Sequence, residues 1–430
     1  MAERLPAMLR AYRRLTTAGT PLARLLLSHR LRRGKEHPER VSERRGHPAM
    51  DRPDGPLIWV HGASVGEMLA VIPLVDRMRA RGFGVLVTSG TLTSAELAQD
   101  RLPEGAIHQF IPLDAPRFIR RFLDHWRPDL ALFAESDLWP NLIMESASRG
   151  IPLVLVNGRL SERSFQRWRK APASIGALLR NFDLCLAQSA TDADRYTELG
   201  APRVRMTGNL KLDVPAPPAN ANDFAAIRAS VGRRPVVAAA STHPGEEAMV
   251  IDAHRQLRGT FPSLLTILVP RHPDRGAGVV DIATVGGLNA VLRSSGYLPD
   301  RGTDLYIADT IGELGMIYRL APIVFIGGSL VRHGGQNPIE AAKLGAAILH
   351  GPHVWNFGEI YSALDAAKGA EQVEDAKQLA SHVAAWLTDS RLRGGVATAA
   401  LRTVEDLGGA LDRTLAAIDP YLMQFRLEHG

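Results

Sequence analysis

A glutamate that follows a short apolar run is the first residue of this chain whose position suggests chemistry. The stretch Ile58–Glu67 has the pattern of a buried strand, a tight glycine-bearing loop and the start of a helix. A carboxylate at such a junction can act as a general base toward an incoming hydroxyl. Ser64 and Glu67 also fit the S-x-x-E capping box, in which Glu67 only accepts the Ser64 backbone N–H. Both interpretations of Glu67 stay open on this pattern.

Three further strand ends in the first half carry charged side chains. Glu135 and Asp137 stand at the end of one apolar run, and two acids there are costly unless they are paired or react. Arg159 follows the next run, where it can bind phosphate or carboxylate or lie in a polar turn. Lys211 follows the last run before a proline-rich stretch. Because carboxyl ends of parallel strands share one edge, we expect these side chains to face a cleft.

A second glycine-bearing junction runs from Gly327–Ser329 to Glu340. Within it Asn337 is a good N-cap, Pro338 suits the first helical position, and Glu340 falls at the third. Glu340 can serve as another capping carboxylate. Alternatively, it can hold ribose hydroxyls while the N-terminus of its helix faces a phosphate.

The common nucleotide and metal motifs are absent from the sequence. There is no G-x-x-x-x-G-K-[ST] loop, no G-x-G-x-x-G fingerprint, no H-E-x-x-H and no paired C-x-x-C. The one D-x-D, Asp192–Asp194, is interpreted as the acidic start of a helix. The single cysteine, Cys185, lies in an apolar run and is predicted to be a buried thiol without catalytic function.

Short apolar runs alternate with helix-length segments along almost the whole chain, which indicates parallel sheets covered on both faces. With 430 residues, the chain is expected to form two domains. The predicted strands of the first half are Leu57–Val60, Gly84–Thr88, Ile107–Leu113, Leu130–Glu135, Leu153–Asn157, Leu184–Gln188 and Val204–Gly208. Those of the second half are Val236–Ala240, Leu264–Val269, Asn289–Leu292, Leu305–Ile307, Ile323–Ile326, Ala346–Leu349 and Gln372–Glu374.

The proline-rich stretch from residue 214 to 224 is predicted to be a linker, since three prolines in four residues favour an extended spacer. The fold class is therefore α/β, with two Rossmann-like doubly wound parallel-sheet domains facing a central cleft. We expect a basic segment at 1–48, a first domain at 49–213, and a second domain with terminal helices at 225–430.

The excess positive charge lies at the N-terminus. Residues 1–45 hold 12 Lys and Arg against 4 Asp and Glu, whereas the remainder holds 39 against 41. A near-neutral body argues against nucleic-acid binding. Arginines mixed with leucines favour contact with an anionic membrane surface, and a solvated basic helix packed on the body is the alternative. No apolar run reaches the 18 residues of a membrane-spanning helix, and no secretory signal is evident.

Taken together, these stretches resemble the 3-deoxy-D-manno-octulosonic acid (Kdo) transferases of Gram-negative lipopolysaccharide assembly. The resemblance runs from about residue 10 to beyond residue 360. The matching stretches are Trp59–Glu67, Ala134–Asn141, Arg159–Ser161, Gly208–Lys211, Pro270–Pro273, Gly327–Leu330, Gly334–Glu340, Gly351–His353 and Asn356–Phe357. The resemblance implies the GT-B glycosyltransferase fold, CMP-Kdo as donor, a lipid A precursor (lipid IVA) as acceptor, and inversion at the transferred sugar.

The resemblance also implies roles for individual residues. Glu67 matches the family's general base, and Glu135 and Lys211 match positions that stabilise the transition state. The CMP-Kdo-binding residues would be Pro270, Arg271, His272, Gly312, Glu313, Leu314, Asn337, Pro338, Ile339 and Glu340. On the acceptor side we place His61, Ser64, Gly66 and Arg159. The family needs no metal or other cofactor for transfer.

The resemblance implies a protein of the inner membrane, attached to its cytoplasmic face. The N-terminus is more basic and less apolar than the anchor of some relatives, so peripheral attachment is preferred over a single spanning anchor. Two alternatives remain. One is a GT-B transferase or epimerase that uses a UDP-sugar, and the other is a non-catalytic module that binds anionic lipid through residues 1–45.

Overall fold

The computed structural model describes residues 5–429 and divides the chain into two compact units. Unit 1 comprises Met1–Val214 together with Gly408–Gly430, and unit 2 comprises Pro215–Leu407. The chain therefore leaves unit 1 after Val214 and returns to it after Leu407. Each unit contains one seven-stranded sheet, so each is described by itself.

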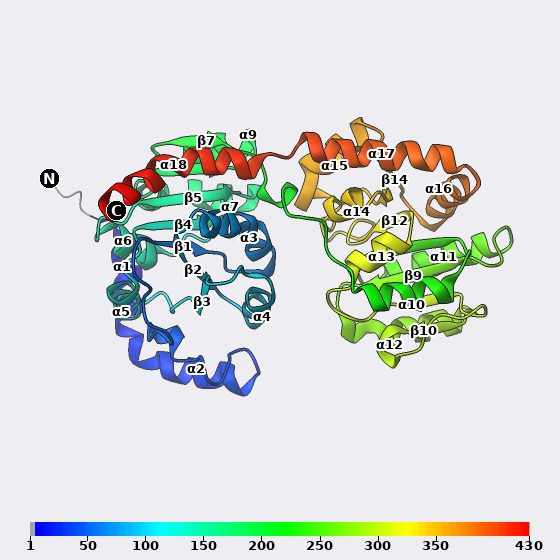
Figure 1. The fold of residues 1–430 in the computed structure, drawn as a ribbon, viewed down its shortest axis with the longest axis horizontal. Helices are drawn as coiled ribbons and strands as arrows, with labels where there is room; N and C mark the ends of the chain where they lie inside the picture. The colour runs from blue at the N-terminus through cyan, green and yellow to red at the C-terminus, as the bar shows by residue number, and fades with distance from the viewer. Residues whose placement is uncertain (1–4, 430) are drawn as a thin grey trace. The chain divides into compact units, whose positions relative to one another are not determined.

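The sheet of unit 1 is parallel throughout, in the order β3-β2-β1-β4-β5-β6-β7 (Figure 1). Its strands are β1 (Leu57–His61), β2 (Gly84–Ser89), β3 (Ile107–Phe110), β4 (Leu130–Ala134), β5 (Leu153–Gly158), β6 (Leu184–Ala187) and β7 (Val204–Met206). The chain reverses its direction of winding between β1 and β4. In open α/β sheets this switch point is where ligands bind, beyond the carboxyl ends of the strands.

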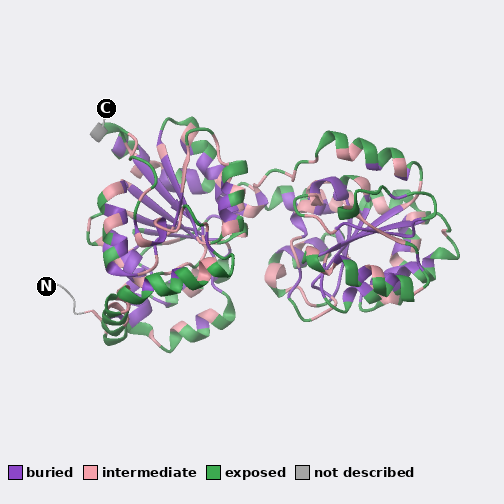
Figure 2. Cartoon of the chain, turned by 90° about the horizontal axis from the view of Figure 1, so that it is seen from below, coloured by how far each residue is buried: buried purple, intermediate pink, exposed green. Residues whose placement is uncertain are grey.

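Helices cover both faces of this sheet, as a parallel sheet requires. They are α1 (Ala7–Ala18), α2 (Ala23–Arg32), α3 (Val65–Ala80), α4 (Leu92–Arg101), α5 (Pro116–Trp126), α6 (Pro140–Ala147), α7 (Glu162–Arg169), α8 (Pro172–Leu179), α9 (Ala190–Glu198) and α18 (Ala410–His429). The strands are buried, whereas the helices keep exposed outer faces (Figure 2).

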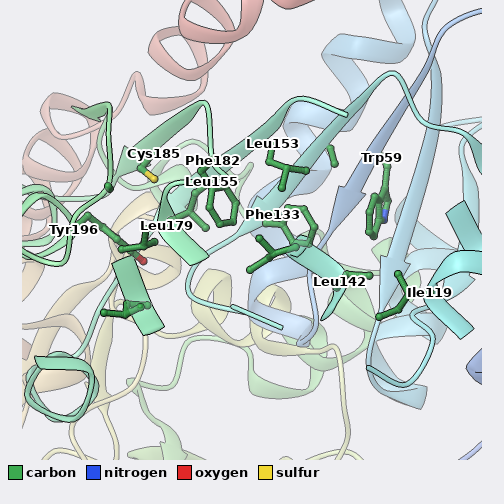
Figure 3. Packing of buried hydrophobic residues seen from close by; sticks show 14 of the residues in the cluster. Trp59, Ile119, Phe133, Leu142, Leu153, Leu155, Leu179, Phe182, Cys185 and Tyr196 are labelled. Atoms are coloured by element: carbon green, nitrogen blue, oxygen red, sulfur yellow. The ribbon is translucent and has the colours of Figure 1, made fainter. Parts of the chain in front are cut away.

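The apolar core of unit 1 lies on both sides of the sheet. On one side Trp59, Phe133 and Phe182 pack with residues of α5, α6 and α8 (Figure 3). Cys185 belongs to this cluster and is fully buried, and burial raises the pKa of its thiol to about 12. The prediction of a buried cysteine is thus confirmed. The opposite side packs against α3 and α18.

The C-terminal helix corrects one predicted domain boundary. Residues 408–430 were expected in the second domain, but α18 packs on unit 1 and completes its core with Leu415, Ile418, Leu422 and Phe425. The carboxylate of Asp213 accepts hydrogen bonds from the backbone N–H groups of Gly409 and Leu411, at 2.7 and 2.6 Å. An apolar stripe predicts that one face of a helix is buried, but it does not indicate which of the two sheets the helix packs against.

The basic N-terminal segment belongs to unit 1 rather than standing apart from it. On α1, the Tyr12 hydroxyl donates to Asp114 at 2.8 Å, and Arg13 pairs with Glu145 at 2.7 Å. Further along, the guanidinium of Arg44 donates to Glu36 at 2.9 Å and to the Gly90 carbonyl at 2.6 Å. Among residues 5–429, no helix is both long and apolar enough to cross a membrane.

Unit 2 holds a second parallel sheet, in the order β10-β11-β9-β8-β12-β13-β14. Its strands are β8 (Val236–Thr242), β9 (Leu265–Pro270), β10 (Ala290–Leu292), β11 (Leu305–Ile307), β12 (Ile323–Ile326), β13 (Ala347–His350) and β14 (Ala370–Gln372). The switch point lies between β8 and β12. One face packs mainly against α11, α12 and α16.

The first helix of unit 2 begins at Ala221, inside the stretch 214–224 predicted to be a linker, because the Asn220 side chain caps it by accepting the Asn222 and Asp223 N–H groups. The helices of unit 2 are α10 (Ala221–Val231), α11 (Glu246–Arg258), α12 (Gly276–Val285), α13 (Leu314–Leu320), α14 (Ile339–Lys343), α15 (Gly358–Ala366), α16 (Ala376–Thr388) and α17 (Ser390–Asp406). The chain from residue 377 onward is mostly helical, as predicted.

All fourteen predicted strands are present, and their ends differ where local hydrogen bonding ends the ladder. β3 stops at Phe110 rather than Leu113, because Pro112 has no N–H to donate and the Leu113 N–H donates to the Arg44 carbonyl. β14 ends at Gln372, two residues early, since the Glu374 N–H already donates to a side chain of α16. The α/β class with two doubly wound parallel sheets is confirmed.

Candidate active site

Glu67 lies at the switch point of unit 1, in the first turn of α3. Its carboxylate accepts hydrogen bonds from the Ala63 N–H at 2.7 Å and from the Ser64 hydroxyl at 2.9 Å. The Glu67 N–H in turn donates to the Ser64 hydroxyl oxygen at 3.3 Å. The helix cap is therefore present, but the carboxylate binds the Ala63 N–H rather than the predicted Ser64 N–H. This network fixes both carboxylate oxygens of Glu67.

The surroundings of Glu67 make it a better base than an ordinary glutamate. Burial raises its pKa, and the charges of Glu135 and Asp137 raise it further. The hydrogen bonds from Ser64 and Ala63 oppose this shift without cancelling it. A carboxylate with a raised pKa holds a transferred proton more firmly, which is what general-base catalysis requires near neutral pH.

Glu135 and Lys211 form an ion pair beside the same loop. The Lys211 ammonium lies 2.5 Å from Glu135 Oε1, and both side chains are largely buried. A methyl group added at Gly66 would come within 3.9 Å of the Lys211 nitrogen, so this glycine lies directly beside the ammonium. The structure therefore brings Glu67, Glu135 and Lys211 together, although they are far apart in the sequence.

Two residues of this site hold the backbone in a left-handed conformation that non-glycine residues rarely adopt. They are Glu135, with φ of 56°, and Asn157, with φ of 54°. The Asn157 side-chain oxygen accepts the Leu210 N–H at 2.9 Å, which fixes the turn that carries Lys211. Strain of this kind is concentrated at functional sites, where the surrounding structure has to maintain it.

His61, Asp137 and Arg159 lie around these three charges. His61 Nε2 lies 3.2 Å from Asp137, and its Nδ1 lies 2.9 Å from the Thr88 hydroxyl. Burial raises the pKa of Asp137, but the hydrogen bond and charge of His61 outweigh it and the pKa lies below its usual range. The Arg159 and Glu135 carbonyls both accept from the Tyr196 hydroxyl. Both acids after β4 therefore have partners, Glu135 in Lys211 and Asp137 in His61, which offsets the cost of placing them at a strand end.

In unit 2, the residues assigned to the donor follow the carboxyl ends of three strands. Pro270 ends β9, and the Arg271 N–H donates to the Thr242 carbonyl at 2.9 Å, which extends the pairing of β9 with β8. The side chains of Arg271 and His272 are exposed. At the next strand end Gly312 has a φ of 87°, a value that favours glycine.

Glu313 is held by its neighbours rather than free. Its carboxylate accepts from Arg293 Nη2 at 2.9 Å and also from the Thr310 hydroxyl. The hydrogen bond to Glu313 raises the pKa of Arg293 above its already high value. Glu313 therefore shapes the turn that precedes Leu314 and α13.

The helix α14 begins one residue later than predicted. Pro338 takes the N-cap position, so Glu340 is the second residue of the helix rather than the third. The Asn337 side-chain oxygen accepts the Ile339 N–H at 3.0 Å, and its amide donates to Glu340 at 3.3 Å. Burial raises the pKa of Glu340 against the opposing effects of Asn337 and Lys343.

Sequence patterns missed the role of Glu246. Its fully buried carboxylate accepts the N–H groups of Gly328, Ser329 and Leu330 at 2.7 to 2.9 Å. These N–H groups of the second glycine junction are therefore occupied by Glu246 and are not free to bind a ligand. The sequence offered little indication of this role, because an acidic residue in the first turn of a helix is ordinarily explained by the helix dipole.

The acids and histidines of these sites do not form a metal centre. Within residues 5–429, no group of three or more His, Cys, Asp or Glu side chains is arranged to hold a metal ion.

Comparison with known proteins identifies close relatives over almost the whole chain. Residues 39–214 match the family model described as 3-deoxy-D-manno-octulosonic-acid transferase (kdotransferase). The 3-deoxy-D-manno-octulosonic acid transferase of Haemophilus influenzae is 35% identical over 398 residues, which cover 89% of this chain and 92% of the relative. The protein of the same name from Bordetella pertussis is 34% identical and covers 94% and 96%.

Solved structures with lower identity share the fold. A glycosyltransferase from Rickettsia africae has a TM-score of 0.60 at 12% identity, covering 86% of this chain and 99% of its own. The UDP-GlcNAc 2-epimerase of Neisseria meningitidis has a TM-score of 0.59 at 12% identity, covering 86% and 100%. Both support the GT-B architecture predicted from the sequence, and at this identity they indicate nothing beyond it.

Proposed function

The chain belongs to the 3-deoxy-D-manno-octulosonic acid transferase family, and on that premise we propose that Glu67 is the base with which it moves Kdo from CMP-Kdo to a lipid A precursor. Kdo transfer in lipopolysaccharide biosynthesis is the activity of this glycosyltransferase. The alternative of a non-catalytic lipid-binding module is therefore excluded. The lipid acceptor, the inversion at the transferred sugar, the roles of individual residues and the attachment to the membrane are our proposals.

The single observation that carries the proposal is the environment of Glu67. Its carboxylate is oriented by Ala63 and Ser64, and its pKa is raised by burial and by two neighbouring acids. In the proposed step Glu67 takes the proton from a glucosamine hydroxyl of the acceptor. The hydroxyl oxygen then forms a bond to the anomeric carbon of Kdo while the bond from that carbon to the CMP phosphate breaks. This single displacement inverts the anomeric centre.

Charge on the departing CMP needs compensation, and two cations are proposed to supply it. Arg271 follows β9 at the donor side, and the Lys211 ammonium is already oriented by Glu135. Glu340 has one carboxylate oxygen outside its hydrogen bond with Asn337, which leaves an acceptor for ribose hydroxyls. His61, Ser64, Gly66 and Arg159 remain our proposed acceptor-side residues.

A lipid acceptor requires the enzyme to reach a membrane surface, and we assign this contact to α1 and α2. Leu15 and Leu25 are 72% and 68% exposed, and Met8, Leu22 and Leu26 are also at least half exposed. These apolar side chains lie among arginines such as Arg14 and Arg24. Apolar and cationic side chains together fit an anionic bilayer, so we propose peripheral attachment to the cytoplasmic face of the inner membrane.

Vesicle flotation tests this attachment. We expect the protein to bind vesicles containing anionic phospholipid and Leu25→Glu to bind them at least tenfold more weakly. Met423→Glu is the matched control, because Met423 is 64% exposed on α18, outside the proposed surface. Equal loss in both variants, or equal binding of neutral and anionic vesicles, would contradict the assignment.

Incubation with freshly generated CMP-Kdo and lipid IVA tests the reaction itself. Mass spectrometry of the lipid is expected to show a gain of one or more Kdo units. Because the proposed reaction uses no metal, we expect the same gain in the presence of EDTA. Transfer only to a non-lipid acceptor would refute the assigned acceptor. Loss of transfer on chelation, with recovery on added divalent cation, would refute the metal-free reaction.

A further inference from the structure

The switch point of unit 2 contains histidines to which neither the sequence patterns nor the proposed reaction gives a role. His243 directly follows β8, and His333 lies in the loop between β12 and α14. The pairing of β8 with β9 shifts register between Ala240 and Thr242, and Ser241 there has a φ of 57°. This is the third strained non-glycine residue at a strand end, and the first in unit 2.

Three imidazole rings meet at this point. The rings of His243 and His333 stack with centroids 3.7 Å apart, and His272 lies 6.2 Å from His243, nearly edge to face. His243 Nε2 lies 3.0 Å from the side-chain nitrogen of Gln336, which directly precedes Asn337. The cluster therefore adjoins both segments that are proposed to bind the donor.

Within residues 5–429, no carboxylate near the histidine cluster is left unengaged to compensate the positive charge there. Arg271 and Arg275 also act on His243, and burial together with these cations lowers its pKa to about 4. Of the two nearby carboxylates, Glu246 is used by backbone N–H groups and Glu247 pairs with Arg275 at 3.3 Å. Among the described residues, the side chains of Arg271, His272 and His333 have no hydrogen bond or ion pair.

Two details indicate that the histidine cluster does more than fill the core. His243 is only 5% exposed, although its ring has a single hydrogen-bonding neighbour. Arg275 Nη1 is buried and has no hydrogen-bond partner. Glu247 Oε2 lies 3.3 Å from Arg275 Nη2 and is likewise buried without a hydrogen bond, so this ion pair leaves buried polar atoms unsatisfied, which is rare in native proteins. An anion supplies acceptors and also compensates the cations around it.

We propose that His243 and His333 bind the carboxylate of the donor sugar. The inference rests on the proposed function, since it takes CMP-Kdo as the donor. Kdo is an ulosonic acid, in which the carboxylate and the CMP phosphate are bonded to the same anomeric carbon. The carboxylate must therefore lie within a few Å of the phosphate, next to the segments that carry Arg271 and Asn337. The imidazole cluster adjoins those segments, and the guanidinium groups of Arg271 and Arg275 supply positive charge beside it.

This subsite determines specificity for acidic donor sugars. A hexose or N-acetylhexosamine nucleotide has no carboxylate at its anomeric carbon, so it leaves the cations uncompensated. Carboxylate binding also favours the protonated imidazole. Burial and the neighbouring charges lower the pKa of His243 to about 4, so it is neutral at pH 7 in the free protein, and a bound carboxylate raises this pKa so that binding brings fractional proton uptake. CMP alone lacks the carboxylate and produces no such uptake.

Calorimetric titration of the full-length protein at pH 7 tests the subsite. CMP and freshly generated CMP-Kdo are titrated without acceptor, in buffers of different ionisation enthalpy. We expect His243→Gln and His333→Gln to weaken CMP-Kdo binding at least tenfold, to leave CMP binding within twofold, and to abolish the proton uptake. His382→Gln on α16 is the matched control, since its ring packs against Trp386.

The binding data distinguish a failure of the carboxylate subsite from a failure of the proposed donor. Equal loss of CMP and CMP-Kdo affinity, or unchanged CMP-Kdo affinity, overturns the carboxylate subsite. If the wild-type protein binds neither ligand, the proposed donor itself is wrong, which is a distinct result. If the buried His243 variant does not fold, the exposed His333 variant gives the same comparison.

Discussion

The hydrogen bonds of Glu67 establish the helix cap, one of the two interpretations that its sequence pattern left open. Ser64 and Ala63 use it as a helix cap, and the same bonds orient its carboxylate at the switch point beside Glu135 and Lys211. Capping and base catalysis are therefore compatible functions of one side chain. What separates them experimentally is the rate of transfer.

Replacing Glu67 by glutamine is expected to lower kcat by about 10²–10⁴-fold, the usual contribution of a general base. The amide keeps the size of the side chain and one acceptor, so the fold persists. Glu96→Gln on α4 is the matched control, because Glu96 is exposed and outside the site. Steady-state kinetics with circular dichroism check the prediction. Near-normal kcat in a folded Glu67→Gln protein would rule out the proposed role.

The pH profile of kcat/KM reports the raised pKa of Glu67. The base acts only when ionised, so the acid limb is expected above the value of about 4.3 for an unperturbed glutamate. Removing a neighbouring negative charge lowers this pKa, so Glu135→Gln is expected to shift the limb to lower pH. An unshifted limb would mean that another group controls it.

The same shift has a consequence for stability. Since burial favours the neutral carboxyl, the stabilising contribution of neutral Glu67 is complete below its unfolded pKa and is lost as pH rises through its folded pKa. We therefore expect the stability of Glu67→Gln relative to the wild type to be more favourable at pH 8 than at pH 4. Urea unfolding at both pH values measures the difference.

At the scale of elements, the strands were predictable and the partner of α18 was not. Continuous apolar runs such as Leu130–Ala134 fill strands that are buried on both faces, so their composition alone identifies them. The apolar residues of α18 equally fit a helix on either sheet. Only three-dimensional packing and the bonds of Asp213 to Gly409 and Leu411 show that the helix completes unit 1.

Leu422→Ala on α18 is expected to destabilise unit 1 by about 2–5 kcal/mol, because Leu422 is buried in its core. Leu427→Ala is the control on the same helix, since Leu427 is 86% exposed and should change stability by less than about 0.5 kcal/mol. Hydrogen exchange of the β1 and β4 amides measures the effect. Equal protection in both variants would mean that α18 contributes little to the core of unit 1.

At the scale of the whole molecule, some residues of the candidate site could be predicted from the sequence and others could not. The acids after β1 and β4 and the polar residues after β9 and β12 were identifiable, because strand ends in a doubly wound sheet are expected to carry function. Glu246 and His243 were not, since a buried acid at a helix start and a lone histidine have ordinary structural explanations. Their significance depends on groups brought together from separate segments, such as Gly328 and His333.

Nucleotide preference tests CMP-Kdo as the proposed donor. We expect CMP to raise the unfolding temperature and UDP at equal concentration to do so much less. A ligand at 100 times its Kd stabilises by about 2.7 kcal/mol. Differential scanning fluorimetry checks this, with AMP as a further control. Preferential protection by UDP would contradict CMP-Kdo as the donor.

The return of the chain to unit 1 also sets the order in which the protein can be completed during translation. Leu415, Ile418, Leu422 and Phe425 belong to the core of unit 1, yet they are synthesised after the whole of unit 2. Until then, one face of the nascent sheet is covered by α3 but lacks α18, and it exposes apolar surface. Nascent unit 1 therefore keeps apolar surface exposed for longer than unit 2, which is continuous in sequence and has its full core earlier.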